Sequence, residues 1–307
     1  MAHLGDGQDD AMVGRFAPSP TSALHVGNLR TAPAAWLMAR HAGRGFVLRV
    51  EDLDVARVAA APEVAAGQLA DLAALGLDHD GPVMVQSERL DAYAAAAAAL
   101  PTYECYCTRR EIAEAASAPH DDGYRPYPGT CRGLSDAERA ARRPVRPPAL
   151  RVAADGASVT VHDRWAGPVT GVVDDFVVRR NDGAWAYNLA VVVDDLAQGV
   201  TQVVRGDDLL SSSPRQAWLA RRLGGVEPAY AHMGLVVNAA GQRLAKRDGA
   251  VTLADLARQG LDAAGVLTLL GASLGLCTTD EHVTAATLLG RFDPAAVEHG
   301  AWVWRGR

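Results

Sequence analysis

The sequence predicts an α/β fold in which a parallel sheet is connected by crossover helices. Two observations carry this prediction. Strand-like apolar segments at 13–16 and 46–51 flank a helical stretch at 25–40, so the chain begins with a strand–loop–helix–strand unit. Helical and strand-like segments then keep alternating, which is typical of parallel strands joined by helices.

The later elements follow in order along the chain. We expect helices at 62–75, 87–99 (capped by Ser87) and 213–223, and strand-like segments at 83–85, 152–161, 171–180, 187–193, 200–205 and 235–238. Cysteines, prolines, glycines and arginines interrupt this alternation in the segment 101–150. We therefore predict five parts: a disordered lead-in (1–13), two halves of a sheet domain (14–100 and 171–250), an insertion (101–170) and a short helical region (251–307).

Composition and charge limit the class of protein. With 49% hydrophobic and 21% charged residues, the chain of 307 residues is typical of a globular protein. It shows no secretory signal, and its longest apolar stretch, 92–100, is too short to span a bilayer. We therefore expect a cytoplasmic monomer that makes no membrane contact.

The net charge of −6 argues against general nucleic-acid binding, because proteins that bind nucleic acid without specificity are usually basic. A nucleic-acid partner must therefore meet a local patch. The segment 132–151 holds six arginines against two acidic residues, which gives a local charge of +4. This segment is either such a patch or a solvated linker, since charge runs commonly face water.

Four cysteines occur in the chain, and three of them fall within 27 residues: Cys105, Cys107 and Cys131. In a reducing compartment a disulfide framework is not expected. The clustering suggests a metal site, and the alternative is a set of three free buried thiols. Cys277 stands alone and is typical of a core residue.

The first chemical signal is a Pro-rich loop between the first strand and the first helix. It has the sequence RFAPSPTSALHVGN, and the helix opens at His25. A helix N-terminus offers free N–H groups and a positive dipole end, both of which suit a phosphate. Gly27 leaves room for a nucleotide beside the backbone, and His25 can donate hydrogen bonds to a phosphate.

The second signal is the loop GQRLAKRDG at 241–249, which carries three cations between its glycines. Such a loop can close over a leaving pyrophosphate and neutralise its charge. Taken by itself, the loop is also typical of a basic surface turn.

Together, HVGN behind PSPT and the downstream LAKR resemble the paired HIGH and KMSKS signatures of class I aminoacyl-tRNA synthetases, with a Rossmann-like pattern between them. The segments RFAPSPT, RVEDLD (49–54), YNLA (187–190), VDD (193–195) and RGDDL (205–209) resemble the glutamate branch of that class. The likeness covers roughly residues 14–253. We find no P-loop and no GxGxxG fingerprint, so a kinase or a dehydrogenase has no support.

Within this branch, the chain is similar to the glutamyl-queuosine tRNA(Asp) synthetases. Its length is that of this family, and only 57 residues follow position 250, which is short for an anticodon-binding domain of on the order of 100 residues. Cys105, Cys107, Tyr127 and Cys131 resemble the Cys-x-Cys…Tyr-x-x-x-Cys zinc set of that family. These enzymes attach glutamate to the queuosine base in the anticodon of tRNA(Asp).

The resemblance implies a residue-by-residue assignment. The implied substrates are L-glutamate, ATP with Mg²⁺, and tRNA(Asp) carrying queuosine, and the implied metal cofactor is Zn²⁺. Glutamate would contact Arg15, Phe16, Ala17, Pro18, Ser19, Glu51, Tyr187 and Arg205. ATP would contact His25, Gly27, Asn28 and Lys246, of which His25 and Lys246 are the expected catalytic residues. Zinc would be held by Cys105, Cys107, Cys131 and Tyr127, with Tyr124 or His120 as alternatives to the tyrosine.

Several alternatives stay open. Arg205 or Arg15 is suited to the substrate side chain, because arginine pairs with a carboxylate in a bidentate manner. Glu51 is suited to the substrate ammonium group, or it pairs with Arg49 or Arg57. The chain departs from the family pattern at three positions, Ser22, Pro33 and Ala245. Proline inside the first helix would bend it unless it lies in the first turns.

Three other functions agree less well with these residues. A truncated conventional glutamyl-tRNA synthetase would charge tRNA(Glu), and the short C-terminal region argues against it. A non-catalytic tRNA-binding module would not need His25, Lys246 and the glutamate pocket. A nucleotidyltransferase with an HxGH motif would carry a second histidine where Asn28 stands.

Overall fold

The core of the molecule is a mostly parallel sheet. The computed structural model describes residues 13–54, 61–108, 110–112, 126–244 and 251–306. Its main sheet has the order β3-β2-β1-β9-β10-β6-β7. The strands are β1 (Val13–Phe16), β2 (Phe46–Val50), β3 (Met84–Val85), β6 (Ala157–Asp163), β7 (Gly167–Val173), β9 (Val200–Gly206) and β10 (Ala229–Met233). Neighbours from β3 to β6 run parallel, and β7 is antiparallel to β6. The predicted α/β class is confirmed.

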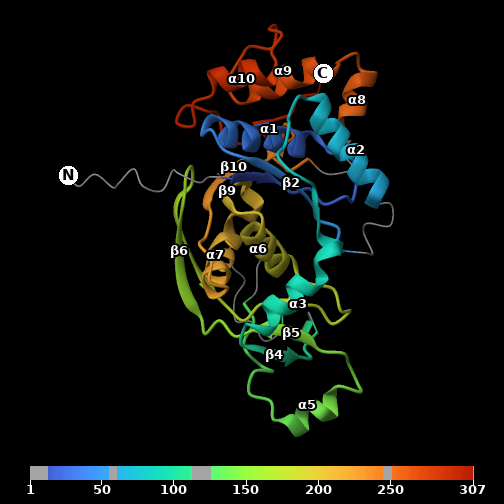
Figure 1. Cartoon of the computed structure of the whole chain (residues 1–307), viewed down its shortest axis with the longest axis vertical. Helices are drawn as coiled ribbons and strands as arrows, with labels where there is room; N and C mark the ends of the chain where they lie inside the picture. Colours follow the sequence, from blue (N-terminus) through green and yellow to red (C-terminus); the bar gives the residue numbers. More distant parts are fainter. Residues whose placement is uncertain (1–12, 55–60, 109, 113–125, 245–250, 307) are drawn as a thin grey trace, which may run out of the picture.

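Helices cover both faces of this sheet (Figure 1). They are α1 (Val26–His41), α2 (Ala61–Ala74), α3 (Leu90–Ala98), α6 (Tyr187–Ala197), α7 (Ser213–Arg222), α8 (Leu253–Arg258), α9 (Ala263–Ser273) and α10 (Ala285–Arg291). One core joins α1 and the sheet to the C-terminal helices, and a second joins α3, α6 and α7 to β6 and β7. The short helices expected after 251 are confirmed. None of the helices in the described part of the chain has the length and apolar character needed to cross a membrane.

The segment 187–193 is a helix, so the prediction of a strand-like element there is wrong. Its residues form the first two turns of α6, and Leu189, Ala190 and Val191 are buried. A short apolar run fits a buried helix as well as a buried strand, and its sequence alone does not separate the two. The prediction also missed β10, which lies between β9 and β6 in the main sheet.

A second, antiparallel sheet lies at the base of the inserted region. It consists of β4 (Thr102–Cys105), β5 (Ala149–Val152) and β8 (Val177–Arg179). The predicted strands 152–161 and 171–180 are therefore each split between two sheets. The first splits at Asp155 and Gly156, whose φ values of 58° and 65° turn the chain between β5 and β6. Between β4 and β5 lies the exposed helix α5 (Asp136–Arg142).

Two predicted helix boundaries need correction. The helix expected at 87–99 is a short 3₁₀ turn, η1 (Gln86–Arg89), followed by α3. Ser87 does not cap it, because its hydroxyl donates to Asp52 at 2.7 Å. Helix α1 continues through Pro33, well past its first turn, and ends at His41.

A small parallel sheet joins the C-terminal segment to the chain that follows β10. It consists of β11 (Val236–Val237), close to the predicted strand at 235–238, and β12 (Trp302–Val303). Val237 of β11 also forms an antiparallel bridge with Arg243. Thus β11 contacts both the C-terminal segment and the chain that leads to position 244.

Candidate active site

The predicted substrate residues converge on one cavity of about 460 Å³. It lies where β1 ends and α1 begins, and β9 and α6 also contribute lining residues. Eleven predicted residues line it: Arg15, Phe16, Ala17, Pro18, Ser19, His25, Gly27, Asn28, Glu51, Tyr187 and Arg205. Lys246 and Ala245 lie outside the described residues, although Arg243 and Leu244 just before them also line the cavity.

His25 is the N-cap of α1 rather than its first helical residue. Its Nδ1 accepts a hydrogen bond from Gly27 N at 3.2 Å, and Asn28 Oδ1 accepts from His25 N at 3.4 Å. Because Nδ1 is an acceptor, the neutral ring carries its proton on Nε2. A Cβ at Gly27 would lie 3.1 Å from the His25 ring. Gly27 therefore makes room for the histidine, in addition to any nucleotide.

Arg15 is a buried cation with few protein contacts. Its side chain is 5% exposed, its Nη1 donates to Val204 O at 3.4 Å, and its Nε lies 3.6 Å from Asp195. Among the described residues, no acceptor lies within hydrogen-bond distance of Nε. Burial lowers the pKa of Arg15, and the nearby charges of Arg49 and Arg205 lower it further, although Asp195 opposes them. Such a group favours an anion in the cavity.

Glu51 supplies the opposite charge in the same cavity. Its carboxylate accepts a hydrogen bond from Arg49 at 3.4 Å, so the predicted pairing with Arg49 exists alongside its place on the cavity wall. Arg57 lies outside the described residues. Burial raises the pKa of Glu51, and the charges of Arg49 and Arg15 counter that rise. Tyr187, at the first position of α6, lies on the same wall and is 39% exposed.

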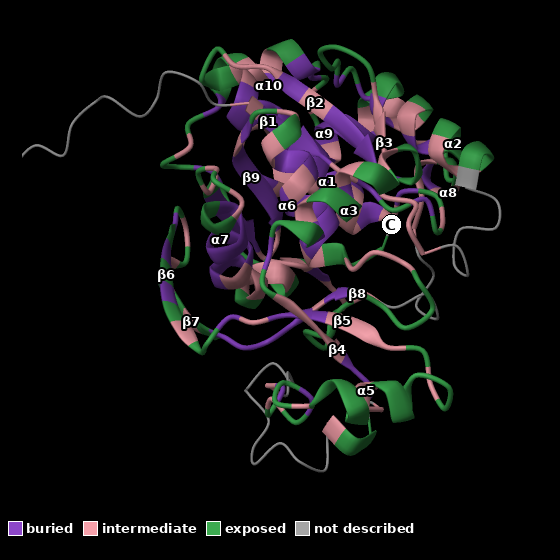
Figure 2. Cartoon of the chain, turned by 60° about the horizontal axis from the view of Figure 1, so that its bottom comes forward, coloured by how far each residue is buried: buried purple, intermediate pink, exposed green. Residues whose placement is uncertain are grey.

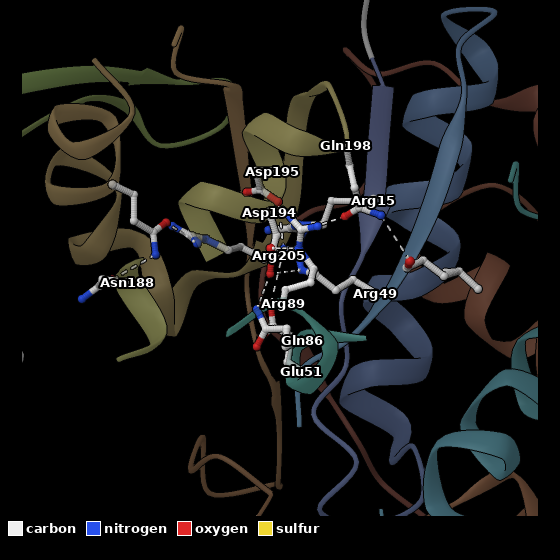
Figure 3. A network of polar contacts seen from close by, with 12 residues as sticks. Arg15, Arg49, Glu51, Gln86, Arg89, Asn188, Asp194, Asp195, Gln198 and Arg205 are labelled. Atoms are coloured by element: carbon white, nitrogen blue, oxygen red, sulfur yellow. Dashed lines mark hydrogen bonds and ion pairs between the residues drawn. The ribbon is translucent and has the colours of Figure 1, made fainter. Parts of the chain in front are cut away.

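Arg49 belongs to a polar network that includes Asp194, Asp195 and Gln198 (Figure 3). It is fully buried and donates to Asp195 at 2.8 Å and to Gln198 at 2.8 Å. Burial alone would lower its pKa, but Asp195, Glu51 and Asp194 raise it above the usual arginine value. Since its charge is balanced by carboxylates, Arg49 is a structural cation.

Arg205 is held in a different way, by neutral acceptors. Its guanidinium donates to His232 Nε2 at 2.8 Å, Gln216 Oε1 at 2.7 Å, Ser213 Oγ at 2.9 Å and Leu209 O at 3.2 Å. These are four hydrogen bonds to described residues, against five N–H groups in an arginine. Arg205 lines the cavity and keeps a charge that these partners do not neutralise.

Sequence reasoning missed two further features of the cavity. Gln68 of α2 is 2% exposed and donates to Ser19 O at 3.1 Å and to Ser22 O at 2.8 Å, so it holds the Pro-rich loop in place. Arg243 forms an ion pair with Asp208 at 2.7 Å, and both residues line the cavity. A buried glutamine carries no sequence signal of its own, because its partners are backbone carbonyls of another segment.

A second group of residues is called here the cysteine cluster: Cys105, Cys107, Tyr127 and Cys131. Two of them, Cys105 and Cys107, line a neighbouring cavity that shares Ser19, Glu51 and Tyr187 with the first. The three Sγ atoms lie within 4.8 Å of one another. Tyr127 Oη is 3.4 Å from Cys105 Sγ and 3.6 Å from Cys107 Sγ, and Cys107 and Cys131 are 3.5 Å apart. Tyr124 and His120, the predicted alternatives, lie outside the described residues.

Most arginines of the segment 132–151 have partners within the protein. Arg132 pairs with Asp155 and Asp175, Arg139 with Asp136, and Arg143 with Glu104. Arg146 donates to Tyr106 O at 3.2 Å, and Arg151 is buried over the Tyr127 ring. In Figure 2, α5 is mostly exposed. Three of the six arginines thus form ion pairs on an exposed surface, and the two sequence interpretations stay predictions.

Comparison with known proteins places this site in a family. The family model for tRNA synthetases class I (E and Q), catalytic domain, matches residues 11–286. A Nocardia farcinica protein named glutamyl-Q tRNA(Asp) synthetase is 58% identical over 94% of this chain and 92% of its own length. A Symbiobacterium thermophilum protein of the same name is 46% identical, over 93% and 94% of the two chains.

A solved structure shows the same fold. Glutamate-tRNA synthetase from Elizabethkingia anophelis superimposes with a TM-score of 0.79 at 25% identity, covering 97% of this chain and 68% of that one. The cavity, the two signature segments and these relatives lead to one assignment. The chain belongs to the class I tRNA synthetases for glutamate and glutamine, as a ligase of the glutamyl-Q tRNA(Asp) synthetase family.

Proposed function

We propose that this protein activates L-glutamate with ATP and transfers it to the queuosine base in the anticodon of tRNA(Asp). The observation that carries the proposal is the pairing of opposite charges in one cavity. Arg15 and Arg205 offer buried, incompletely neutralised cations for a carboxylate, and Glu51 offers an anion for an ammonium group. An amino acid with a carboxylate side chain fits this pattern.

The reaction would begin with an in-line attack of the glutamate α-carboxylate on the α-phosphorus of ATP, which forms glutamyl-adenylate and releases pyrophosphate. His25 lies at the N-terminus of α1, where its Nε2–H can donate to a phosphate oxygen. Lys246 would neutralise the leaving pyrophosphate. Mg²⁺ bound to ATP would supply further charge neutralisation. A hydroxyl of the queuosine ring would then attack the activated carbonyl and release AMP.

The first test is pyrophosphate exchange with glutamate, glutamine and aspartate. We expect exchange with glutamate to exceed exchange with the other two, because glutamine lacks the charge and aspartate lacks the length. Equal exchange with glutamine would contradict the assigned roles of Arg15 and Arg205.

The second test identifies the acceptor. Radiolabelled glutamate should enter tRNA(Asp) carrying queuosine, or its isolated anticodon stem-loop, and the same RNA without queuosine should stay unlabelled. Periodate should abolish labelling by cleaving the queuosine cis-diol, whereas removal of the 3′ terminal adenosine should leave labelling intact. Efficient charging of tRNA(Glu) at its 3′ end would instead establish a conventional glutamyl-tRNA synthetase.

We further propose that the cysteine cluster holds one Zn²⁺. Zn–S bonds of about 2.3 Å in a tetrahedron separate two sulfurs by roughly 3.8 Å, close to the 3.5 Å between Cys107 and Cys131. The Tyr127 oxygen lies at a similar distance from two of the thiols. Burial and the neighbouring thiols raise the pKa of Tyr127, so its phenolate form would depend on the charge of the bound ion. The ion would stiffen the inserted region beside the cavity.

A further inference from the structure

Behind Arg205 lies a chain of two fully buried side chains that the proposed reaction does not yet use. Arg205 Nε donates to His232 Nε2 at 2.8 Å, and His232 Nδ1 lies 2.6 Å from Asp163 Oδ2. The side chains of His232 and Asp163 are both 0% exposed. The three residues come from β9, β10 and β6, which are neighbours in the main sheet.

The direction of each hydrogen bond follows from the chemistry of arginine. Its Nε–H can only donate, so His232 Nε2 must accept, and the ring proton must lie on Nδ1, where it donates to Asp163. Burial lowers the pKa of His232, and the charge of Arg205 adds to this effect. Burial alone would raise the pKa of Asp163, but hydrogen bonds from His232, Ala166 and Trp165 lower it to about 2. The pair is thus neutral histidine and ionised aspartate.

The contrast with Arg49 shows what this arrangement achieves. Arg49 contacts carboxylates directly, at 2.8 Å for Asp195 and 3.4 Å for Glu51, so its charge is balanced within the protein. At Arg205 an imidazole separates the guanidinium from the carboxylate of Asp163. The guanidinium is held rigidly, yet its charge is left for an anion that enters the cavity.

We propose that the Asp163–His232 pair positions Arg205 and so determines the preference for a carboxylate over an amide in the substrate side chain. This inference rests on the proposed function, since it concerns the choice between glutamate and glutamine. His232 and Asp163 are positioning residues, because Arg205 lies between them and the cavity. The neutral, Nδ1-protonated ring is the form that accepts from Arg205.

Two substitutions of His232 separate its two hydrogen bonds. His232→Asn places an amide near the Nδ1 position, so it keeps a donor for Asp163 and loses the acceptor for Arg205. His232→Gln places an amide oxygen near the Nε2 position, so it keeps the acceptor for Arg205 and loses the donor for Asp163. His162 precedes Asp163 on β6 and is exposed, so His162→Asn is the matched control.

We expect His232→Asn to raise KM for glutamate in pyrophosphate exchange about tenfold, as loss of a hydrogen bond to a charged group does. Its KM for ATP should stay near the parent value, and its preference for glutamate over glutamine should shrink. His232→Gln should keep KM for glutamate within about threefold of the parent but should unfold at a lower temperature, because Asp163 loses a partner. His232→Asn should thus have the larger effect on KM for glutamate, and His232→Gln the larger effect on the unfolding temperature.

The pH dependence of KM for glutamate provides an independent test of the positioning role. Protonation of His232 would place an Nε2–H against Arg205 Nε–H and end their hydrogen bond. The titratable and charged groups that face His232 are Asp163 of β6, Arg205 of β9, Tyr230 of β10, Arg15 of β1 and Asp207 of η2 (Asp207–Ser212). KM for glutamate should therefore rise as pH falls below the usual histidine range of about 6.5, and the rise should be absent in His232→Gln.

The outcomes separate this inference from the proposed function. If the parent exchanges pyrophosphate with glutamate but His232→Asn keeps the parent KM and preference, the positioning role is wrong. Equal losses of kcat and stability in both variants, without a change in KM, would assign the pair a purely structural role and overturn it as well. If the parent does not activate glutamate at all, the proposed function itself fails.

Discussion

Replacing Arg30 with methionine is a test of how the C-terminal segment is joined to the active site. Arg30 is 2% exposed and follows the HVGN segment by two residues. Its guanidinium makes five hydrogen bonds, to the carbonyls of Gly234, Ser273, Glu298 and Gly300 and to the Ser273 hydroxyl, at 2.9 to 3.3 Å. One side chain thus links α1, α9, the segment before β11 and the segment before β12.

Two opposing terms set the expected loss of stability. Losing five hydrogen bonds at about 1 kcal/mol each costs on the order of 5 kcal/mol. Burial lowers the pKa of Arg30 to about 10, although Glu298 opposes the shift. Removing the buried charge therefore recovers roughly 3 kcal/mol at about 1.4 kcal/mol per pKa unit. The net destabilisation should be about 2 kcal/mol, which corresponds to a fall in Tm of roughly 3 °C in a protein of this size.

The assay is thermal or urea unfolding, followed by pyrophosphate exchange on the folded protein. Arg258→Met is the control, because Arg258 is 76% exposed and pairs only with Asp255 among the described residues. A surface pair of that kind contributes about 0.5 kcal/mol. An Arg30→Met protein with the same midpoint as the Arg258→Met protein would refute the reasoning. Because β12 pairs with β11, we also expect exchange to slow even where the protein stays folded.

Further predictions concern catalysis, substrate binding, metal and pH. Lys246→Ala should slow adenylate formation roughly a hundredfold, or by about 3 kcal/mol, with little change in glutamate binding, because the lysine acts on the transition state. A rate within about twofold of the parent would contradict this role. Arg15→Lys should raise KM for glutamate about tenfold, because lysine keeps the charge but lacks the planar fork, while KM for ATP serves as the internal control. Elemental analysis should find about one zinc per chain, and chelation should lower Tm; metal-free protein with full stability and activity would exclude a role for the ion. The free energy of unfolding should fall as pH drops below about 6.5, because His232 binds a proton more readily in the unfolded chain; His232→Gln should show a flatter curve over that range.

Local motifs are the part of this protein that sequence reasoning could identify. The Pro-rich loop with HVGN, the paired downstream loop and the spacing of the cysteine cluster each occupy a short, contiguous segment. Their chemistry depends on neighbours in the chain, such as Gly27 beside His25. The family followed from these motifs, and the α/β class followed from the alternation of strand-like and helical segments; both are confirmed. The residues expected to bind glutamate line one cavity. Their individual roles stay predictions, as does the zinc.

Choices between equivalent local patterns depended on the tertiary structure. The apolar run that starts at Tyr187 suits a buried helix or a buried strand. It forms α6 because it packs against α3, α7 and β9 in the second core. The predicted strands 152–161 and 171–180 are each split because their two halves pair with strands of different sheets. For the first of them, β5 pairs with β4 in the small sheet and β6 pairs with β7 in the main sheet. Pairing of this kind is set by segments distant in sequence, which no local window contains.

The buried polar contacts are the clearest case. Arg30 finds its acceptors 204 to 270 residues away, and Asp163 meets His232 across 69 residues. Each of these side chains by itself is an ordinary arginine, histidine or aspartate in the sequence. By itself, the sequence determined the chemistry that is available at each signature segment. Only the folded sheet decided which charges are neutralised inside the protein and which face the cavity, because burial and distance, rather than residue type, set that balance.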